Sequence, residues 1–441
     1  MCISFSSSFV PESEVMLSRF RLQRRHVVTI LAFFGFANIY AMRANLSVAI
    51  VQMTSDTIAT VNGQQREKKA EFGEWDSVTQ GAILGAFFYG YILTQLPGGC
   101  LAHRYGGKYV YFMSIFGTAV FTLLSPPLAK MGKSLLMAAR FFEGFFEGVS
   151  YPSMHAILAN WAPVMEKTRM TAIAYTGSYV GTVVAMPVSA VLGQQLGWPS
   201  IFYFFGMHPN FIKFFNKLSF HRHDELSHAT VPWKHIFGSK AVWAIVVAHI
   251  CQNWGFYTML TSLPRILENL LSYDHQTAGS LAALPYLAMG LLFHRIICPP
   301  WYLRNRLKIY RFVFLGLLGE AVFLLLATTG VWDSVILISL IASVGLGGLA
   351  WSAFSVNSLD IAPQYAGYLM GLSNTLATLP GMISPLFVGS IVKNQVASEW
   401  HSVFFFTSGI YIFGAFMFWL WARGEVEEWA SNRIALSGAD D

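Results

Sequence analysis

The stretch at 133–161, KSLLMAARFFEGFFEGVSYPSMHAILANW, limits the fold of this chain more than any other. It is long and apolar enough for a membrane-spanning helix, which needs about 20 mostly apolar residues, yet it contains Arg140, Glu143, Glu147 and His155. At about 3.6 residues per turn, these four side chains fall within an arc of about 120° on one helix face. Charged groups are costly inside a bilayer and normally face a protein interior or a water-filled path. The stretch therefore predicts a membrane helix whose polar face is turned toward other helices.

The composition of the whole chain is that of a polytopic membrane protein. Of its 441 residues, 54% are hydrophobic and 12% are charged, against about 25% charged residues in a typical soluble domain. The formal net charge is +6, but the basic residues fall between apolar runs, where they act as topology signals rather than as a nucleic-acid surface. The four cysteines have no paired spacing, so neither a disulfide framework nor a metal site is predicted.

Twelve apolar runs predict an all-α membrane protein with about 12 transmembrane helices in two six-helix halves. The predicted spans are 27–52, 76–101, 109–128, 134–160, 169–193, 199–219, 241–267, 278–298, 311–330, 334–356, 365–392 and 401–422. The predicted divisions are a tail at 1–26, an N-terminal half at 27–220, a linker at 221–240, a C-terminal half at 241–422 and a tail at 423–441. Because basic residues gather in the tail and loops of one side, the positive-inside rule predicts that both termini are cytoplasmic.

A second intramembrane cation lies in the first span. Arg43 stands about 16 residues into a helix that enters from the cytoplasm, or about 24 Å deep, and Arg140 reaches a similar height from the opposite side. Two guanidinium groups at one level suit a carboxylate or phosphate, which they hold through paired N–H bonds. Each arginine could instead neutralise a carboxylate such as Glu143 or Glu147. The sequence leaves both interpretations open, and we favour substrate binding.

Other polar residues in the spans are candidates for coupling and contact. Glu147 lies near the middle of its helix, where an unpaired charge is costly, so we expect it to exchange a proton. His155 shares its face but stands close to the helix end, which fits a coupling role and an interfacial histidine equally. Asn374, in a proline-interrupted span, is a weaker candidate for substrate contact. Three GxxxG pairs, at 144/148, 177/181 and 367/371, are predicted to let helices pack closely.

Several segments resemble the anion/cation symporter family of the major facilitator superfamily, which includes sodium-phosphate cotransporters, sialin and vesicular glutamate transporters. The similar segments include RANLSVAIV (43–51), EGVSYPSMHAILANWAP (147–163), WAIVVAHICQNWGFYTMLTSLP (243–264) and LDIAPQYAGYLMGLSNTLATLPGMISP (359–385). The connection GGCLAHRYGGK is similar to the superfamily loop that locks neighbouring helices, through Gly98, Gly99, Arg104, Gly106, Gly107 and Lys108. His103 stands where that loop usually has Asp. The resemblance implies a central site between two halves and alternating access by rocking of those halves.

The same resemblance assigns roles to individual residues. Arg43 and Arg140 match arginines implicated in anion binding, Glu143 and Glu147 match acids linked to proton coupling, and His155 matches the histidine of that motif. The implied function is secondary active transport of an organic or inorganic anion (phosphate, sialic acid or an acidic amino acid). It would be driven by H⁺ or Na⁺, with no other cofactor.

Differences from the family pattern narrow the expected substrate. The vesicular glutamate branch has Arg, His and His where this chain has Gln252, Leu84 and Tyr286, which favours a sialin-like or phosphate-transporter-like member. Spans six and eight look shortened, because His208-Pro209 interrupts the sixth and Pro299-Pro300 ends the eighth early.

Two alternatives therefore stay open: an uncoupled, passive anion pathway, and a transport-dead, truncated relative that acts as a membrane interaction protein. An enzyme is not expected, since the sequence has no evident nucleophile triad, phosphate-cradling loop or metal cluster. We expect a monomer whose partners are a small anionic substrate and the lipid bilayer, without nucleic acid. It is expected in the plasma membrane or in a lysosomal or vesicular membrane.

Overall fold

The computed structural model describes residues 24–61, 64–161, 167–207, 231–297, 306–329, 332–362 and 365–430. Most of both predicted tails and half of the predicted linker lie outside these residues. The helices of the N-terminal part are α2 (Arg24–Thr54), α3 (Ser77–Tyr105), α4 (Gly107–Met131), α5 (Lys133–Glu147), α6 (Ser150–Trp161), α7 (Lys167–Leu196) and α8 (Pro199–Gly206). Between α2 and α3, β1 (Thr57–Val61) pairs antiparallel with β2 (Gln64–Lys68), which adds a small sheet to the expected helices.

The remaining helices form the C-terminal part. They are α10 (Trp233–Gly238), α11 (Lys240–Leu271), α12 (His275–Leu281), α13 (Leu284–Ile297), α14 (Arg306–Ala327), α15 (Asp333–Ile361), α16 (Ala366–Leu376), α17 (Leu379–Ile391) and α18 (Ala397–Trp421). Three predicted spans are each built from two helices that meet at a short break: the fourth from α5 and α6, the eighth from α12 and α13, and the eleventh from α16 and α17. The described part of the sixth span ends at Met207, and the eighth is described as far as Ile297.

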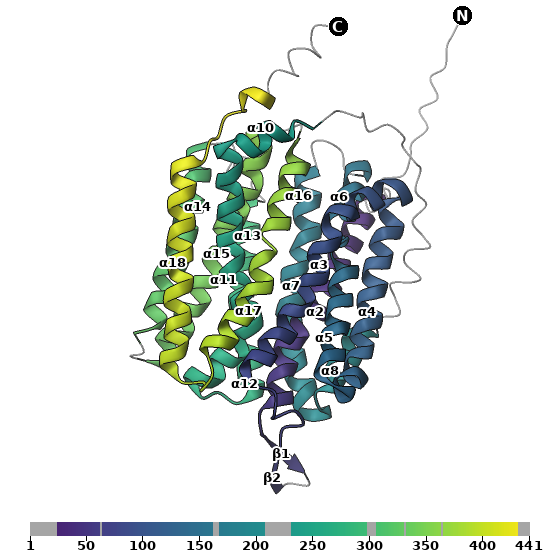
Figure 1. The fold of residues 1–441 in the computed structure, drawn as a ribbon, viewed down its shortest axis with the longest axis vertical. Coiled ribbons are helices and arrows are strands. Elements are labelled where there is room, and N and C mark those ends of the chain that lie inside the picture. Colours follow the sequence, from purple (N-terminus) through teal and green to yellow (C-terminus); the bar gives the residue numbers. More distant parts are fainter. Residues whose placement is uncertain are drawn as a thin grey trace, which may run out of the picture.

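The two parts stand side by side as two helical bundles (Figure 1). Contacts between them run mainly from α3 to α17, from α7 to α12 and α13, and from α2 to α11. The sheet of β1 and β2 lies at one end of the paired bundles and α10 lies at the opposite end (Figure 1). We call these the β end and the α10 end. The chain enters α2 at the α10 end, so Arg43 lies closer to the β end than Tyr40 does.

Close helix packing inside the N-terminal bundle depends on glycine. A Cβ atom on Gly144 of α5 would overlap the carbonyl oxygen of Phe87 of α3, and one on Gly90 of α3 would overlap the carbonyl oxygen of Phe141. The two helices therefore approach each other backbone to backbone, as small residues allow in membrane bundles. The pair Gly177 and Gly181 does the same between α7 and α2. Gly371 does not, because a Cβ there meets nothing within 4 Å, so close packing at that glycine was a wrong expectation.

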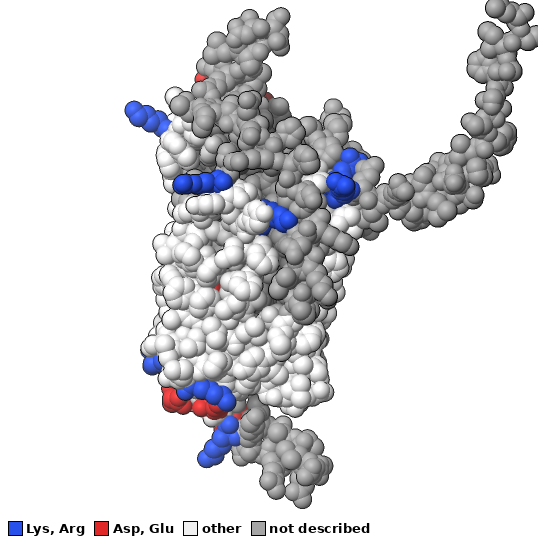
Figure 2. Space-filling model, turned by 90° about the vertical axis from the view of Figure 1, so that its right-hand side faces the viewer, with Lys and Arg blue, Asp and Glu red and all other residues white. Residues whose placement is uncertain are grey.

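The outside of the bundles is apolar over a broad band. On the face shown in Figure 2, the middle of the described surface is almost free of charged side chains, and most of the coloured Lys, Arg, Asp and Glu atoms lie toward the two ends. Within the described residues, six helices or helix pairs are long and apolar enough to cross a membrane: α2, α4, Ile173–Leu196, His275–Phe293, Asp333–Phe354 and α18. The helices α3, α5 and α11, which carry polar groups described below, are not among these six. Their polar residues are covered by the neighbouring helices rather than by lipid.

Candidate functional site

Two buried ion pairs form the centre of the site. A guanidinium N–H of Arg43, on α2, donates to Oε1 of Glu147, on α5. On α5 itself, a guanidinium N–H of Arg140 donates to Oε2 of Glu143 one turn away. All four side chains are at most 3% exposed. A buried charge that loses its partner is strongly destabilising, so each carboxylate fixes the position of its arginine.

This pairing realises the alternative that the sequence left open, in which each arginine neutralises an acid. Each arginine still has a hydrogen-bond donor available, because Nε of Arg43 and Nε of Arg140 have no hydrogen-bond partner among the described residues. Oε2 of Glu147 is also unpartnered, whereas Glu143 accepts a second bond from Oγ of Ser125 on α4 at 3.1 Å. The Arg43–Glu147 pair therefore keeps one unused donor and one unused acceptor.

Aromatic rings surround the Arg43 guanidinium. Its central carbon lies 4.6 Å from the ring centroid of Tyr40 and 4.7 Å from those of Phe87 and Tyr91. The corresponding distance from Arg140 to the Phe87 ring is 5.7 Å, so this one ring serves both cations. Cation–π contacts of this kind stabilise a desolvated guanidinium without neutralising its charge. Tyr257, from the C-terminal bundle, also lies close enough to Arg43 for the two side chains to interact electrostatically.

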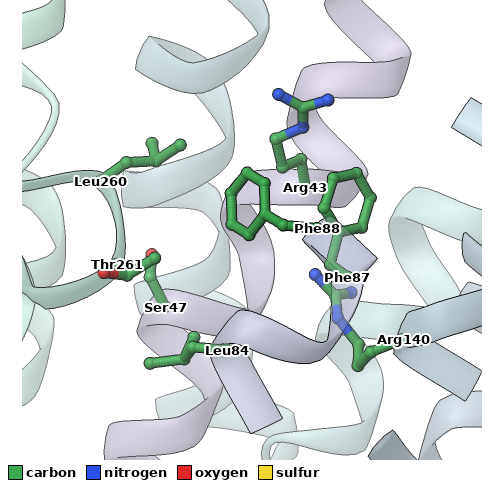
Figure 3. Close-up of a pocket in the computed structure, with 8 residues that line it drawn as sticks. All are labelled: Arg43, Ser47, Leu84, Phe87, Phe88, Arg140, Leu260 and Thr261. Carbon is green, nitrogen blue, oxygen red and sulfur yellow. The ribbon is translucent and has the colours of Figure 1, made fainter. Parts of the chain in front are cut away.

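A small pocket opens beside the two arginines at the interface of the bundles. It is lined by Arg43, Ser47, Leu84, Phe87, Phe88, Arg140, Leu260 and Thr261 (Figure 3). These residues come from α2, α3 and α5 of one bundle and from α11 of the other. The free volume is about 10 Å³, which is room for about one water molecule. In this conformation the walls leave little free space beside the arginines.

His155 does not join the buried cluster. A turn at 148–149 separates α5 from α6, so the single continuous helix assumed for the polar face is interrupted between Glu147 and His155. His155 is exposed, and its ring centroid lies 5.5 Å from that of Tyr175. Tyr151, also on α6, holds the position nearest the cluster, with its hydroxyl 2.9 Å from that of Tyr40.

Asn374 lies outside the pocket, closer to the α10 end. Its Nδ2 donates to Oε1 of Gln95 at 3.1 Å, and Nε2 of Gln95 donates to Oγ1 of Thr378 at 2.9 Å. Gln95 belongs to α3, whereas Asn374 and Thr378 belong to the C-terminal bundle at the break between α16 and α17. The structure thus places Asn374 in a polar contact between the bundles rather than among the residues that line the pocket.

The predicted loop at 98–108 is mostly helical. α3 continues to Tyr105, so Gly98, Gly99 and Arg104 are helical residues, and Gly106 alone separates α3 from α4. Gly106 has φ = +88°, a backbone conformation that glycine adopts readily. A Cβ atom on Gly107 would lie 2.7 Å from the carbonyl oxygen of Ser153 on α6, so this turn packs directly on the helix that follows the acidic cluster.

Two cations of the turn lie beside aromatic rings. The Arg104 guanidinium lies 5.6 Å from the ring centroid of Tyr105, and the Lys108 ammonium lies 5.9 Å from that of Tyr109.

Sequence reasoning missed the aromatic and hydroxyl residues of the site. Tyr40 and Arg43 are three residues apart, and Phe87 and Tyr91 are four apart. Residues so spaced are neighbours on a helix surface, so the sequence could have predicted these contacts. Ser47 and Thr261 had none, because small hydroxyl residues are common in apolar spans. Leu84, singled out as a departure from the vesicular glutamate branch, lies in the pocket wall. Among the described residues, no group of three or more His, Cys, Asp or Glu side chains could hold a metal ion.

The fold and the site together define a multi-pass membrane protein whose two helical bundles enclose a charged site at their interface. The family model of the Major Facilitator Superfamily matches residues 28–385. Human sialin is 39% identical over 450 residues, covering 92% of this chain and 91% of sialin. Bovine vesicular glutamate transporter 1 is 34% identical over 443 residues, covering 93% of this chain and 79% of that protein. The chain therefore belongs to the major facilitator superfamily, in the family that includes sialin and the vesicular glutamate transporters.

Solved structures agree on the fold at low sequence identity. A D-xylose-proton symporter superposes with a TM-score of 0.72 at 14% identity, covering 90% of this chain and 98% of the symporter. A bacterial homologue of the human lysosomal transporter Spinster, in an inward-facing and occupied conformation, superposes with a TM-score of 0.66 at 13% identity, covering 95% and 98% of the two chains. These likenesses concern the fold alone. The expected superfamily fold of twelve membrane helices is confirmed.

Proposed function

We propose that this protein is a secondary active transporter that moves a small organic or inorganic anion across a membrane by alternating access, coupled to H⁺ or Na⁺. The observation that carries the proposal is the pair of buried arginines, each with an unused Nε donor, beside a pocket that both bundles line. Guanidinium donors in a dry site are well suited to carboxylate or phosphate. The printed names of the relatives, sialin and vesicular glutamate transporters, support a transport role.

The charge of the cluster favours coupling to a cation. Arg43, Arg140, Glu143 and Glu147 sum to zero when all four are ionised. A monovalent anion bound between the arginines would leave one uncompensated negative charge in a buried site, which is costly. Protonation of Glu147 removes that charge and also releases Arg43 from its partner. Anion binding and proton uptake therefore favour each other, which is the condition for symport.

Several finer expectations belong to the same proposal. Glu143 is the less suitable proton carrier of the two acids, because Ser125 and Arg140 both hold its carboxylate. The positive-inside pattern supports a cytoplasmic location for the α10 end and both termini. Sialin-like or phosphate-like substrates are preferred over glutamate alone, and the protein acts as a monomeric transporter rather than an enzyme. The site would lie in the plasma membrane or in a lysosomal or vesicular membrane.

Reconstituted proteoliposomes test the proposal directly. Uptake of labelled phosphate, sialic acid, glutamate and aspartate is measured under an inward proton gradient and then under an inward sodium gradient. We expect concentrative uptake of at least one anion with one of the gradients, its loss in Arg140→Ala, and uptake no longer driven by the gradient in Glu147→Gln. Glu320→Gln is the matched control, because Glu320 is a buried carboxylate of the other bundle that accepts from the Gln252 amide at 2.9 Å. It should keep gradient-driven uptake.

The remaining outcomes decide between the alternatives. Flux that needs no cation gradient and survives Glu147→Gln would support the passive pathway. No uptake of any of the four anions by well-folded protein, under either gradient, would support the transport-dead interpretation. Sodium-driven uptake that persists in Glu147→Gln would show that the coupling site lies outside the acidic cluster.

A further inference from the structure

A third arginine is buried at the interface of the bundles, toward the β end. Arg265 lies on α11 and is 8% exposed. Its guanidinium donates to Oε1 of Gln80, which lies on α3 of the opposite bundle. Nε2 of Gln80 in turn donates to the carbonyl oxygen of Trp75 at 2.9 Å, which fixes the Gln80 side chain with its oxygen toward the arginine.

The position of this contact relative to the pocket is given by two helices independently. Thr261 of α11 and Leu84 of α3 both line the pocket. Arg265 and Gln80 are each four residues from these, in both cases toward the β end. Four residues correspond to about one helical turn and about 6 Å along the axis, and residues so spaced share a helix face. The Arg265–Gln80 contact therefore lies one turn from the pocket, between it and the β end.

Arg265 differs from the other two buried arginines in its partner. Arg43 and Arg140 each hold a carboxylate, whereas no ion pair to Arg265 is found among the described residues. The nearest acid along its helix, Glu268, pairs instead with Nδ1 of His275. A buried guanidinium held by one neutral oxygen keeps its full charge and most of its donors, so it is an attractive partner for an anion.

We propose that Arg265 is a docking site for the carboxylate or phosphate group of the transported anion, occupied as the anion passes between the β end and the arginine pair. This inference rests on the proposed function. When the bundles separate at the β end, α3 moves away from α11 and the Gln80 oxygen leaves Arg265. The cation is then unoccupied in the conformation that admits the anion. When the bundles close again, Gln80 takes back the guanidinium and the anion moves one turn deeper, to Arg43 and Arg140.

The test is anion uptake measured separately from each membrane face in oriented proteoliposomes. We expect Arg265→Gln to raise KM for entry from the β end by about 10- to 100-fold, the range for losing a hydrogen bond to a charged group, with a smaller change in kcat. Entry from the α10 end should change much less, because Arg265 is not on that side of the pocket. Arg265→Lys should restore part of the affinity, since the charge is kept and the fork of donors is lost.

Two further variants separate docking from general effects. Lys130→Gln is the matched control, since Lys130 is an exposed cation of the same end, 3.8 Å from Glu71; its KM should stay unchanged. Gln80→Glu places a carboxylate on Arg265 while keeping the arginine, so it should compete with the anion and raise KM from the β end as well. Melting temperatures in detergent show whether each variant is folded.

An unchanged KM in folded Arg265→Gln, an equal KM change on both faces, or an equal effect of Lys130→Gln would overturn the docking site while leaving the proposed function intact. Absence of anion uptake by the wild-type protein would instead refute the proposed function, and the docking site with it.

Discussion

The Arg43–Glu147 pair can be tested as an ionic contact through protein stability. Glu147→Gln keeps the shape and hydrogen-bonding capacity of the side chain but leaves Arg43 without a counter-charge. Breaking a buried ion pair on one side costs about 3–5 kcal/mol. The rings of Tyr40, Phe87 and Tyr91 stabilise the cation in both forms, by about 0.5–2 kcal/mol each. We therefore expect Glu147→Gln to lower the free energy of unfolding by about 3 kcal/mol, near the lower end of that range.

The double variant Arg43→Gln/Glu147→Gln removes both charges. Its two amides can still hydrogen-bond across α2 and α5, so its stability should return to within about 1 kcal/mol of wild type, because replacing both members of a buried pair is often close to neutral. Arg43→Gln should cost about as much as Glu147→Gln, so the pairwise coupling energy from the cycle should then be about 5–6 kcal/mol. Glu320→Gln is the control, since Glu320 accepts from a neutral amide and leaves no cation unpaired.

The assay is denaturant unfolding of the purified protein in detergent, followed by tryptophan fluorescence, for wild type, the two single variants, the double variant and the control. If Glu147→Gln were as stable as wild type and the double variant gained nothing over it, the pair would not be ionic in this conformation. The charge argument for coupling would then fail. The double variant should also be inactive in anion uptake, which separates the stability of the cluster from its role in transport.

Three other changes have clear expected outcomes. Gly144→Ala should destabilise the N-terminal bundle by at least about 1–3 kcal/mol, because its Cβ would overlap the Phe87 carbonyl oxygen, whereas Gly371→Ala, with nothing within 4 Å, should leave the melting temperature in detergent unchanged. The hydroxyl of Thr277 and nearby backbone N–H groups lower the pKa of the Asp274 carboxyl, which caps α12. The capping contribution is therefore full above the ordinary value of 3.8 and is lost as the pH falls below it. Asp274→Ala should cost about 1 kcal/mol at neutral pH, and the difference from wild type in denaturant unfolding should shrink toward pH 3. Leu84→His adds an ionisable group to the pocket wall and should change the ratio of uptake rates among the tested anions, whereas Leu84→Met, of similar volume, should not.

The membrane spans could be predicted from the sequence because each is a long apolar run with polar ends. The polar face of α5 was equally readable, since Arg140, Glu143 and Glu147 share one face at helical spacing. His155 lies beyond a turn between α5 and α6, and its exposed side chain stands apart from the buried cluster, whereas Tyr151, one turn earlier, still reaches Tyr40. Gly148 and Pro152 flank that region, and they could have warned of a break.

The partners of the site residues could not be read from the chain. Glu147 lies 104 positions from Arg43, and which arginine it meets depends on how α2 and α5 are rotated against each other. Arg265 was overlooked because an arginine near the end of a predicted span normally extends its side chain to the membrane surface. In the folded protein it is instead buried at the interface of the bundles, with Gln80 of α3 as its hydrogen-bond partner.

The polar contacts of the site are of two kinds, which differ in what can break them. The Arg140–Glu143 pair lies within one helix, and Arg43–Glu147 joins two helices of the same bundle, so rocking of the bundles moves each pair as a unit. Only a change of charge, through a proton or an anion, can release these arginines. The Arg265–Gln80 contact crosses the interface, so rocking must break it. A transporter needs both kinds of contact, because ion binding must alter one set and movement of the bundles must alter the other.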